Sequence, residues 1–158
     1  MNYTILNNEK PAQADVLAIA APLQQFNLQA GPAPNARAVT LQLVNEEGKT
    51  VGGLFAKIGY EHLFVEFLVV PEQARGTGLG RELMMRAETI AQEQNCTGAW
   101  LQTLDFQARG FYEKIGYTVF AQLDNFPAGG TLYFMRKSLE PAGPATPESA
   151  ASSGSHSK

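Results

Sequence analysis

The sequence contains a single cysteine, Cys96, and no long run of apolar residues among its 158 positions. One cysteine cannot form an internal disulfide, which excludes the disulfide frameworks of small secreted domains. No apolar run approaches the roughly 18 uncharged residues that a membrane-spanning helix needs. The N-terminus has neither a basic region nor the apolar core of a secretory signal, so we expect a cytoplasmic protein without a membrane partner.

The chain also lacks an excess of basic residues. Its 12 lysines and arginines are outnumbered by 15 aspartates and glutamates, which gives a net charge of −3. A protein that binds nucleic acid usually presents a basic surface to the phosphates, so this balance argues against a nucleic-acid partner and favours a cationic one. No metal site is expected either.

Large apolar residues disappear after Glu140, which separates the chain into two parts. Residues 1–139 have the length and the apolar content of one folded domain. Residues 140–158 are rich in proline, alanine, serine and glycine and offer no large apolar side chain to bury. Burial there cannot offset the loss of chain entropy, so we expect a disordered C-terminal tail.

Within the domain, the spacing of apolar residues predicts strands that alternate with helices. Strict alternation at Val39, Leu41 and Leu43 is typical of a half-buried strand. Apolar residues after Leu79 recur at helical spacing, whereas Pro22 should break an earlier helical run into two helices. The expected strands are residues 3–6, 39–43, 51–60, 63–70, 99–104, 117–123 and 131–139, and the expected helices lie at residues 11–26 and 79–91 and in a short segment that Asp105 caps and Gly116 ends.

A turn with three glycines joins the apolar strand 63–70 to the helix that begins at Leu79. The turn reads ARGTGLGR over residues 74–81, with glycine at positions 76, 78 and 80. Glycine has no Cβ, so the main chain can approach an anion closely, and the N–H groups at a helix start point towards it. A lone glycine would only supply positive φ to a turn, but three of them behind an arginine favour a phosphate site.

Two common phosphate-binding motifs do not fit this turn. The nucleotide P-loop requires a Lys-Ser or Lys-Thr pair after its glycines, and no such pair follows here. The dinucleotide fingerprint G-x-G-x-x-G requires its third glycine one residue later than this chain has it. Binding of a nucleotide phosphate therefore stays open only as a weaker alternative.

The pattern that does fit is Arg-x-x-Gly-x-Gly, formed by Arg75, Gly78 and Gly80 behind residues 69–72 (VVPE). It resembles the acetyl-CoA signature of the GNAT superfamily of N-acetyltransferases. Residues 105–117 (DFQARGFYEKIGY) resemble a later segment of that superfamily, N-x-x-A-x-x-F-Y-E-K-x-G-[FY], with aspartate in place of the frequent first asparagine. The two motifs follow the family's order, about thirty residues apart, and the resemblance covers roughly residues 3–139.

The resemblance implies an α/β (α+β) fold with a mixed, mostly antiparallel central sheet of six to seven strands and helices on both faces. It implies acetyl-CoA as co-substrate, with the diphosphate on the amides of the turn and the pantetheine arm beside the strand. The same strand also has the composition of a simple buried strand, and both descriptions can hold together. The residues expected to bind the cofactor are Leu68, Val69, Val70, Arg75, Gly76, Thr77, Gly78, Leu79 and Gly80.

Acetyl transfer to an amine needs a group that accepts a proton from the amine. A lysine-like amine is almost fully protonated at pH 7, and freeing its lone pair costs roughly 4–5 kcal/mol. Glu66 is the candidate base because it interrupts an apolar strand, where a charge is costly unless it is exposed or paired. The alternatives are a carboxylate-held water as the base, or a structural role for Glu66 on an exposed sheet face or paired with Lys57. His62 and Glu61 are weaker candidates.

The leaving thiolate needs a hydrogen-bond donor, and Tyr112 stands at the position of the family's general-acid tyrosine. A phenol with a pKa of about 10 is a weaker acid than a thiol near 8.5. We therefore expect Tyr112 to stabilise the thiolate mainly through a hydrogen bond rather than by full proton transfer. The structural alternative is a packed aromatic ring with a satisfied hydroxyl.

The acceptor is the least defined part of the predicted reaction. The resemblance places its site beside residues 23–34 and the loop 124–130. Asp124, Phe126 and Tyr133 are the candidate acceptor-binding residues, because a carboxylate and aromatic faces bind cationic amines. The resemblance implies direct transfer to an amine of a small molecule or protein in a ternary complex, and a homodimer stays open. The alternative function is a non-catalytic acyl-CoA-binding regulatory module, which needs the turn but not Tyr112.

Overall fold

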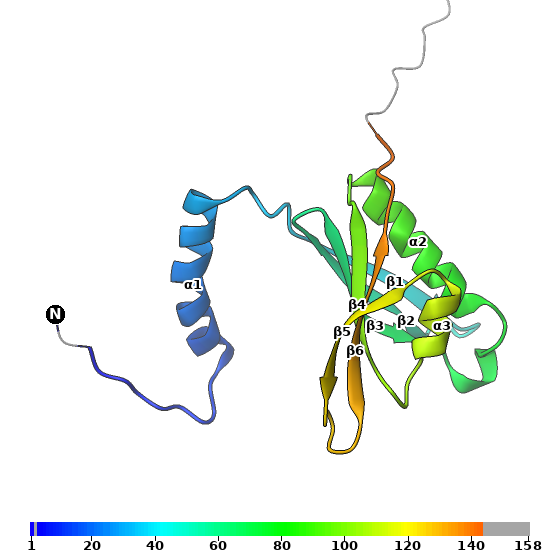
Figure 1. Ribbon diagram of the computed structural model, residues 1–158, viewed down its shortest axis with the longest axis horizontal. Coiled ribbons are helices and arrows are strands. Elements are labelled where there is room, and N and C mark those ends of the chain that lie inside the picture. Colours follow the sequence, from blue (N-terminus) through cyan, green and yellow to red (C-terminus); the bar gives the residue numbers. More distant parts are fainter. Residues whose placement is uncertain (2, 144–158) are drawn as a thin grey trace, which may run out of the picture. The chain divides into compact units, whose positions relative to one another are not determined.

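A six-stranded sheet forms the centre of the larger of two units into which the chain divides, Met1–Pro34 and Asn35–Lys158. The computed structural model describes residues 1 and 3–143. β3 and β4 are parallel, and the other neighbouring strands are antiparallel, which confirms the predicted mixed, mostly antiparallel sheet. The strands are β1 (Arg37–Val44), β2 (Thr50–Gly59), β3 (His62–Val69), β4 (Gly98–Leu104), β5 (Thr118–Asp124) and β6 (Thr131–Ser138), in the spatial order β1-β2-β3-β4-β6-β5 (Figure 1).

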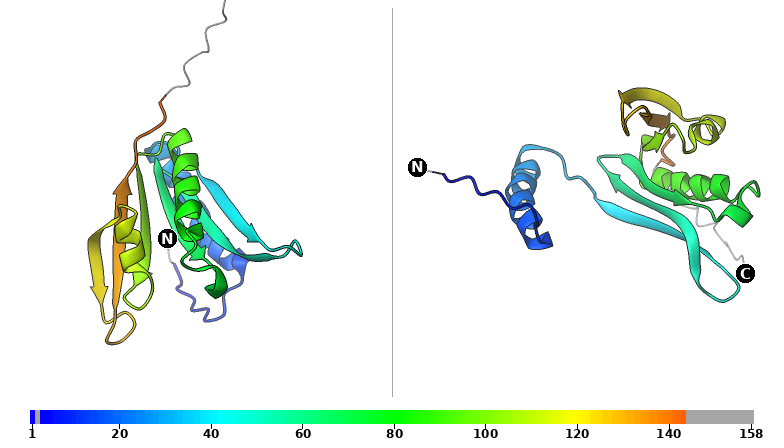
Figure 2. Two further views of the ribbon diagram at one scale, coloured as in Figure 1. Left: turned by 90° about the vertical axis from the view of Figure 1, so that its right-hand side faces the viewer. Right: turned by 90° about the horizontal axis from the view of Figure 1, so that it is seen from below.

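Helix α2 (Leu79–Glu93) lies across one face of this sheet and contacts β1, β2 and β3 (Figure 2). A short 3-10 turn, η1 (Glu72–Ala74), precedes it. The predicted apolar stripe faces the sheet, where Leu83, Ala87 and Ala91 are buried, and Met84 is buried beside them. Each large aliphatic side chain contributes roughly 1.5–3 kcal/mol on burial. This packing fixes the helix and therefore the turn at its N-terminus.

Helix α3 (Arg109–Lys114) is a six-residue helix between β4 and β5. Gly116, with a φ of +96°, follows its C-terminus as predicted. The prediction that Asp105 caps its N-terminus is wrong, because the helix begins after Ala108 and no side chain caps it. The Asp105 carboxylate instead accepts a hydrogen bond of 3.1 Å from the N–H of Thr131, the first residue of β6.

The unit Met1–Pro34 consists of helix α1 (Gln13–Ala30) and the segment before it. The prediction of two helices is wrong, because Pro22 lies inside one continuous helix. Pro22 removes one N–H donor, but the carbonyl left without it belongs to the exposed Ala18, where water can bind it. The predicted strand at residues 3–6 is also wrong, since no other described strand pairs with it. A helix on the second face of the sheet stays a prediction.

The chain after β6 is hydrogen-bonded to Gln92 near the end of α2. The Gln92 side-chain amide donates to the carbonyl of Glu140 at 2.9 Å, and the N–H of Ala142 donates to the main-chain oxygen of Gln92 at 3.0 Å. The predicted tail is therefore held by α2 over its first residues. Residues 144–158 lie outside the described residues, so disorder there stays a prediction. None of the helices in the described residues is long and apolar enough to cross a bilayer.

Candidate functional site

Strands β3 and β4 separate halfway along the sheet. Their pairing covers four residue pairs and ends at Val65 and Leu101. β4 stays paired with β6 as far as Leu104, and β3 with β2 as far as Val69. The main-chain groups of residues 66–69 that face β4 therefore have no strand partner, and the two halves of the sheet diverge in the left view of Figure 2. We call this opening the β3–β4 gap.

Glu66 is the first residue of β3 beyond the last pair with β4. It forms a β-bulge, because consecutive residues of β2 pair with Val65 and Phe67 and leave Glu66 as an extra residue. Its Oε1 accepts a hydrogen bond of 2.7 Å from Nζ of Lys57, and its side chain remains 22% exposed. The ion pair considered as an alternative is present. Oε2 makes no hydrogen bond within the described part of the chain, so one oxygen is left for a ligand.

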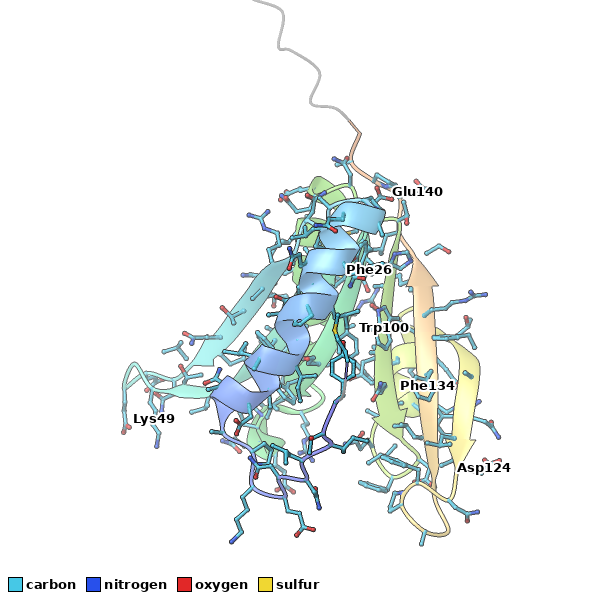
Figure 3. The ribbon with its side chains drawn as sticks, turned by 90° about the vertical axis from the view of Figure 1, so that its left-hand side faces the viewer. Phe26, Lys49, Trp100, Asp124, Phe134 and Glu140 are labelled. Atoms are coloured by element: carbon cyan, nitrogen blue, oxygen red, sulfur yellow. The ribbon has the colours of Figure 1, made fainter. Side chains whose placement is uncertain are left out.

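This ion pair lies on the sheet face away from α2. Ala56 and Ile58, on either side of Lys57, are buried in the core beneath α2, and side chains alternate along a strand. Trp100 of β4 lies on the same face, labelled in Figure 3, with its ring stacked on Phe64 at a centroid distance of 4.0 Å. A flat aromatic surface therefore borders the carboxylate of Glu66.

The glycine turn between η1 and α2 has the geometry of an anion site. Gly76 and Gly78 have φ values of +76° and +89°, so both also serve the turn through left-handed backbone. A Cβ at either position would meet no atom within 4 Å, so the space above the main chain is open. Gly78 directly precedes α2, and no side chain caps the helix. The first N–H groups of α2, at the positive end of its dipole, are therefore available to an anion.

Three further residues of the predicted signature fix this turn. The Nε of Arg75 donates to the carbonyl of Val70 at 3.4 Å, which holds the turn against the end of β3. The Thr77 hydroxyl donates to a main-chain oxygen three residues earlier at 2.6 Å. Gly80 lies against α3, since a Cβ there would be 3.3 Å from the ring of Phe111. The glycines thus differ in role: two expose main chain, and the third lets two helices approach.

Tyr112 of α3 lies in the core between the helices and the sheet and is 8% exposed. Burial raises the pKa of Tyr112 to about 12, so the phenol keeps its proton at neutral pH. Its hydroxyl makes no hydrogen bond within the described residues, where no fully buried side-chain oxygen lacks a partner. The hydroxyl therefore reaches accessible space. Packing accounts for the ring but leaves the hydroxyl free to bind a ligand.

Two polar residues order the loop before α3. Thr103 was not predicted from the sequence, and Asp105 was predicted to make a different contact. Thr103 is 2% exposed, and its hydroxyl oxygen accepts a hydrogen bond of 3.3 Å from the N–H of Ala108. Asp105 binds the N–H of Thr131 with its carboxylate and the Thr131 carbonyl with its own N–H. For Thr103, the available signal was a threonine at a core position of an apolar strand. For the contact of Asp105 with Thr131, the local sequence gives no signal.

The predicted acceptor residues lie on the other side of β4 from the gap. Asp124 ends β5, where its carboxylate accepts a hydrogen bond of 3.1 Å from Gln122. Tyr133 of β6 packs against the core, and the guanidinium carbon of Arg109 lies 4.5 Å from its ring centre. Phe126 is about half exposed in the β5–β6 loop. The structure brings Asp124 and Tyr133 onto adjacent strands but does not place them on the face that carries Glu66.

A groove lies at the start of β4, and neither Glu66 nor the glycine turn lines it. It has a volume of about 910 Å³, and its lining includes His62, Trp100, Phe120, Arg136 and Lys137. His62, a weaker candidate base, has its Nδ1 3.0 Å from the carbonyl of Tyr60 and its ring against Gly98. The candidate site is therefore an open strand edge with an adjoining turn, rather than this groove.

Known proteins share this fold and these segments. A family model described as "Acetyltransferase (GNAT) family" matches residues 5–117, which include β3, the glycine turn, α2 and Tyr112. Blasticidin-S acetyltransferase of Streptomyces morookaense is 41% identical over 95 residues, covering 60% of this chain and 70% of that protein. Acetyltransferase Atu2258 of Agrobacterium fabrum is 30% identical over 137 residues, covering 87% and 98%. A crystal structure of an acetyltransferase from Bacillus cereus ATCC 14579 has a TM-score of 0.75 and 31% identity, covering 85% of this chain and 98% of its own.

Proposed function

Because the chain belongs to the acetyltransferase (GNAT) family, we propose that it transfers the acetyl group of acetyl-CoA directly to a primary amine in a ternary complex. The family membership and the acyltransferase class predicted from the two motifs are confirmed. The observation that carries the proposal is that the glycine turn directly follows the strand that borders the β3–β4 gap. An anion site next to an unpaired strand edge suits a ligand that joins a diphosphate to an amide-containing arm.

The proposed cofactor site uses main chain more than side chains. The amides of Gly76, Gly78 and the first turn of α2 hold the diphosphate, and Arg75 and Thr77 keep the turn in shape. The pantetheine arm bonds main-chain groups of β3 near residues 68–70, where no strand competes for them. The thioester then lies in the gap, between the free oxygen of Glu66 and the hydroxyl of Tyr112.

Glu66 accepts the amine proton in this proposal, either directly or through a water bound to Oε2. Its ion pair with Lys57 uses only Oε1, so Lys57 orients the carboxylate and keeps the second oxygen available. The base must supply the roughly 4–5 kcal/mol needed to deprotonate a lysine-like amine at pH 7. The stacked rings of Phe64 and Trp100 give the neutral amine an apolar surface.

Tyr112 stabilises the leaving thiolate in this proposal by donating a hydrogen bond. With a pKa of about 12, its phenol is a much weaker acid than a coenzyme thiol near 8.5, and complete proton transfer would be uphill by about 5 kcal/mol. The proton of the tetrahedral intermediate's amine is the better final source. Cys96 is fully buried and burial raises its pKa, so direct transfer without an acyl-cysteine is the simpler route.

Release of free thiol from acetyl-CoA in the presence of an amine panel tests this function. The panel contains polyamines, amino acids, aminoglycosides and peptide N-termini, and also blasticidin S, after which the 41% identical relative is named. Amine-dependent thiol release supports the proposal, and the best acceptor decides between a small molecule and a protein. Tight acetyl-CoA binding by calorimetry with no turnover on any amine would favour a regulatory acyl-CoA-binding module instead.

A further inference from the structure

A buried charged cluster joins α2 to the segment after α3. Glu88 of α2 is 7% exposed, and both of its carboxylate oxygens are bonded. Oε1 accepts a hydrogen bond of 3.0 Å from the hydroxyl of Tyr117, and Oε2 accepts one of 2.6 Å from Nζ of Lys137 on β6. The Lys137 ammonium also lies 5.7 Å from the centre of the Tyr117 ring. We call Glu88, Tyr117 and Lys137 the Glu88 cluster.

Stability alone does not explain this cluster. Removing a carboxylate and an ammonium from water is costly, and apolar side chains of similar size often stabilise a core as well. The same helix has a second ion pair, Glu82 with Arg86, but both of those side chains are more than half exposed. Glu88 differs from Glu82 because its carboxylate also binds the hydroxyl of Tyr117, a core residue that is 1% exposed.

Tyr117 is tied to Tyr112 through both main chain and side chain. The N–H of Tyr117 donates to the carbonyl of Tyr112 at 3.0 Å, and the N–H of Gly116 donates to the carbonyl of Glu113 at 3.1 Å. With Gly116 at positive φ, these two bonds form a Schellman C-cap, in which the side chains of the two end residues meet. Here the rings of Tyr112 and Tyr117 meet edge to face, 6.0 Å apart at 68°.

The glycine turn is connected to α3 by a separate contact. Gly80, in the first turn of α2, lies against the ring of Phe111, and that ring meets Tyr112 edge to face at 5.1 Å. Helix α2 therefore touches the surroundings of Tyr112 at two points, its first turn and Glu88. These points are eight residues, about two helical turns, apart on one continuous helix.

We propose that Glu88 is a positioning residue for Tyr112, which it holds through Tyr117 at the distance from the glycine turn that the bound thioester requires. This inference rests on the proposed acetyl transfer. Glu88 lies in the core and touches neither the turn nor the gap, so its loss leaves cofactor binding intact. It moves the hydroxyl that stabilises the thiolate, and a small misplacement of such a group lowers kcat rather than raising KM.

A double-mutant cycle with Tyr112→Phe tests the proposal. Glu88→Gln keeps the size of the side chain but places an amide against the Lys137 ammonium, and Tyr117→Phe keeps the ring but removes the hydroxyl that Glu88 holds. Each should lower kcat about tenfold and change KM for acetyl-CoA less than about twofold. In the Tyr112→Phe background each should lower kcat less than about twofold, because no hydroxyl is left to misplace. The matched control is Glu93→Gln, at the exposed C-terminal end of the same helix and away from the glycine turn, which should leave kcat unchanged in both backgrounds.

Each outcome of this cycle decides a separate point. Equal losses of kcat in both backgrounds, or no loss in either, overturn the positioning role while the proposed function stands. Absence of wild-type turnover on every amine contradicts the proposed function itself. The positioning role then still has a readout, the NMR signal of ring-labelled Tyr112. We expect it to move in Glu88→Gln and Tyr117→Phe but not in Glu93→Gln; an unmoved signal in the first two variants overturns the role. Because Tyr117→Phe leaves the core charges paired, it serves if Glu88→Gln does not fold.

Discussion

The two edges of β4 behave differently. Towards β6, all seven of its residues are paired, whereas pairing towards β3 stops after four. A fully paired edge offers nothing to a ligand, while an unpaired edge offers main-chain donors and acceptors that an amide can bind. The comparison teaches that one strand can serve as structure on one side and as a binding edge on the other. The proposed acetyl transfer uses the side of β4 that faces β3.

The largest effect is expected from filling the glycine turn beside the open edge, with Gly78→Val. A branched side chain at a φ of +89° is strained and occupies the space above the free amides. Loss of two charge-assisted hydrogen bonds, about 2 kcal/mol each, should weaken acetyl-CoA binding about 10³-fold by calorimetry. Gly48→Val is the matched control, since Gly48 has a φ of +77° and open space in the β1–β2 turn. Equal weakening in both variants would contradict an anion site at Gly78.

Removing the carboxylate at the open edge, with Glu66→Gln, should lower kcat/KM about 10²-fold at pH 7, the usual range for a general base. The deficit should shrink as the pH approaches the amine's own pKa near 10, because the amine then needs no base. Steady-state kinetics from pH 6 to 10 measure both effects. Lys57→Met is the control, since it keeps the carboxylate and removes only its partner. A deficit that does not change with pH would assign Glu66 a structural role.

Tyr112→Phe should lower kcat about 30-fold, because it removes one donor to the developing thiolate, and should leave KM for acetyl-CoA nearly unchanged. The Phe variant keeps the ring that packs against Tyr117. Steady-state kinetics with the best acceptor give both constants. Loss of cofactor affinity instead of kcat would mean that Tyr112 belongs to the wall of the gap rather than to its chemistry.

The same residue predicts how stability depends on pH. Burial raises the pKa of Tyr112 to about 12, above the value of about 10 expected in the unfolded chain. A raised pKa means that the stabilisation is complete below pH 10 and is lost as the pH rises from 10 to 12. At pH 11 the loss from this residue is about 1.4 kcal/mol, which urea unfolding can measure. Tyr112→Phe should lose less stability than wild type between pH 9 and 11, and an equal loss contradicts the shift.

The smallest effect is expected at Asp124 of β5, beyond the edge of β4 that is fully paired with β6. Asp124→Ala removes a carboxylate at the end of β5, on the far side of β6 from the gap. We expect KM for cationic acceptors to rise about three- to fivefold, as for one exposed charge contact, with no change for acetyl-CoA. Competition between cationic and neutral amines measures the selectivity. A change greater than that of Glu66→Gln would reverse the assignment of the two edges.

Local features of the site could be predicted from the sequence, because they depend on residues close together in the chain. Positive φ at Gly76 and Gly78, the apolar stripe of α2 and the glycine after α3 all follow from local backbone preferences and spacing. Six of the seven strands expected from periodicity are present, and the resemblance implied a sheet of six to seven strands. The ion pair of Glu66 with Lys57 was one of two alternatives, and the structure shows it.

Features that depend on distant pairing could not be predicted in this way. Asp105 binds Thr131, 26 residues later, which outweighs its preference for a helix cap. The contacts of Glu88 with Tyr117 and Lys137 join α2 and β6 to the segment after α3, and none of the local sequences indicates them. Pro22 is tolerated within α1 because the helix is exposed, so water can bind the carbonyl that loses its N–H partner. Whether a helix is exposed depends on tertiary structure and cannot be told from the local sequence. The end of β3–β4 pairing likewise depends on two strands that are far apart in the chain.

The bulge at Glu66 has a consequence for comparing relatives of this protein. Val65 and Leu68 both face the core although they are three residues apart, so the inside–outside parity of β3 changes at the extra residue. Deleting Glu66 would restore regular alternation, with Val65 and Leu68 still facing the core and Phe67 still facing outwards. A relative without the bulge should therefore have one residue fewer in this strand, and an alignment that places no gap at Glu66 would misassign every position on one side of it.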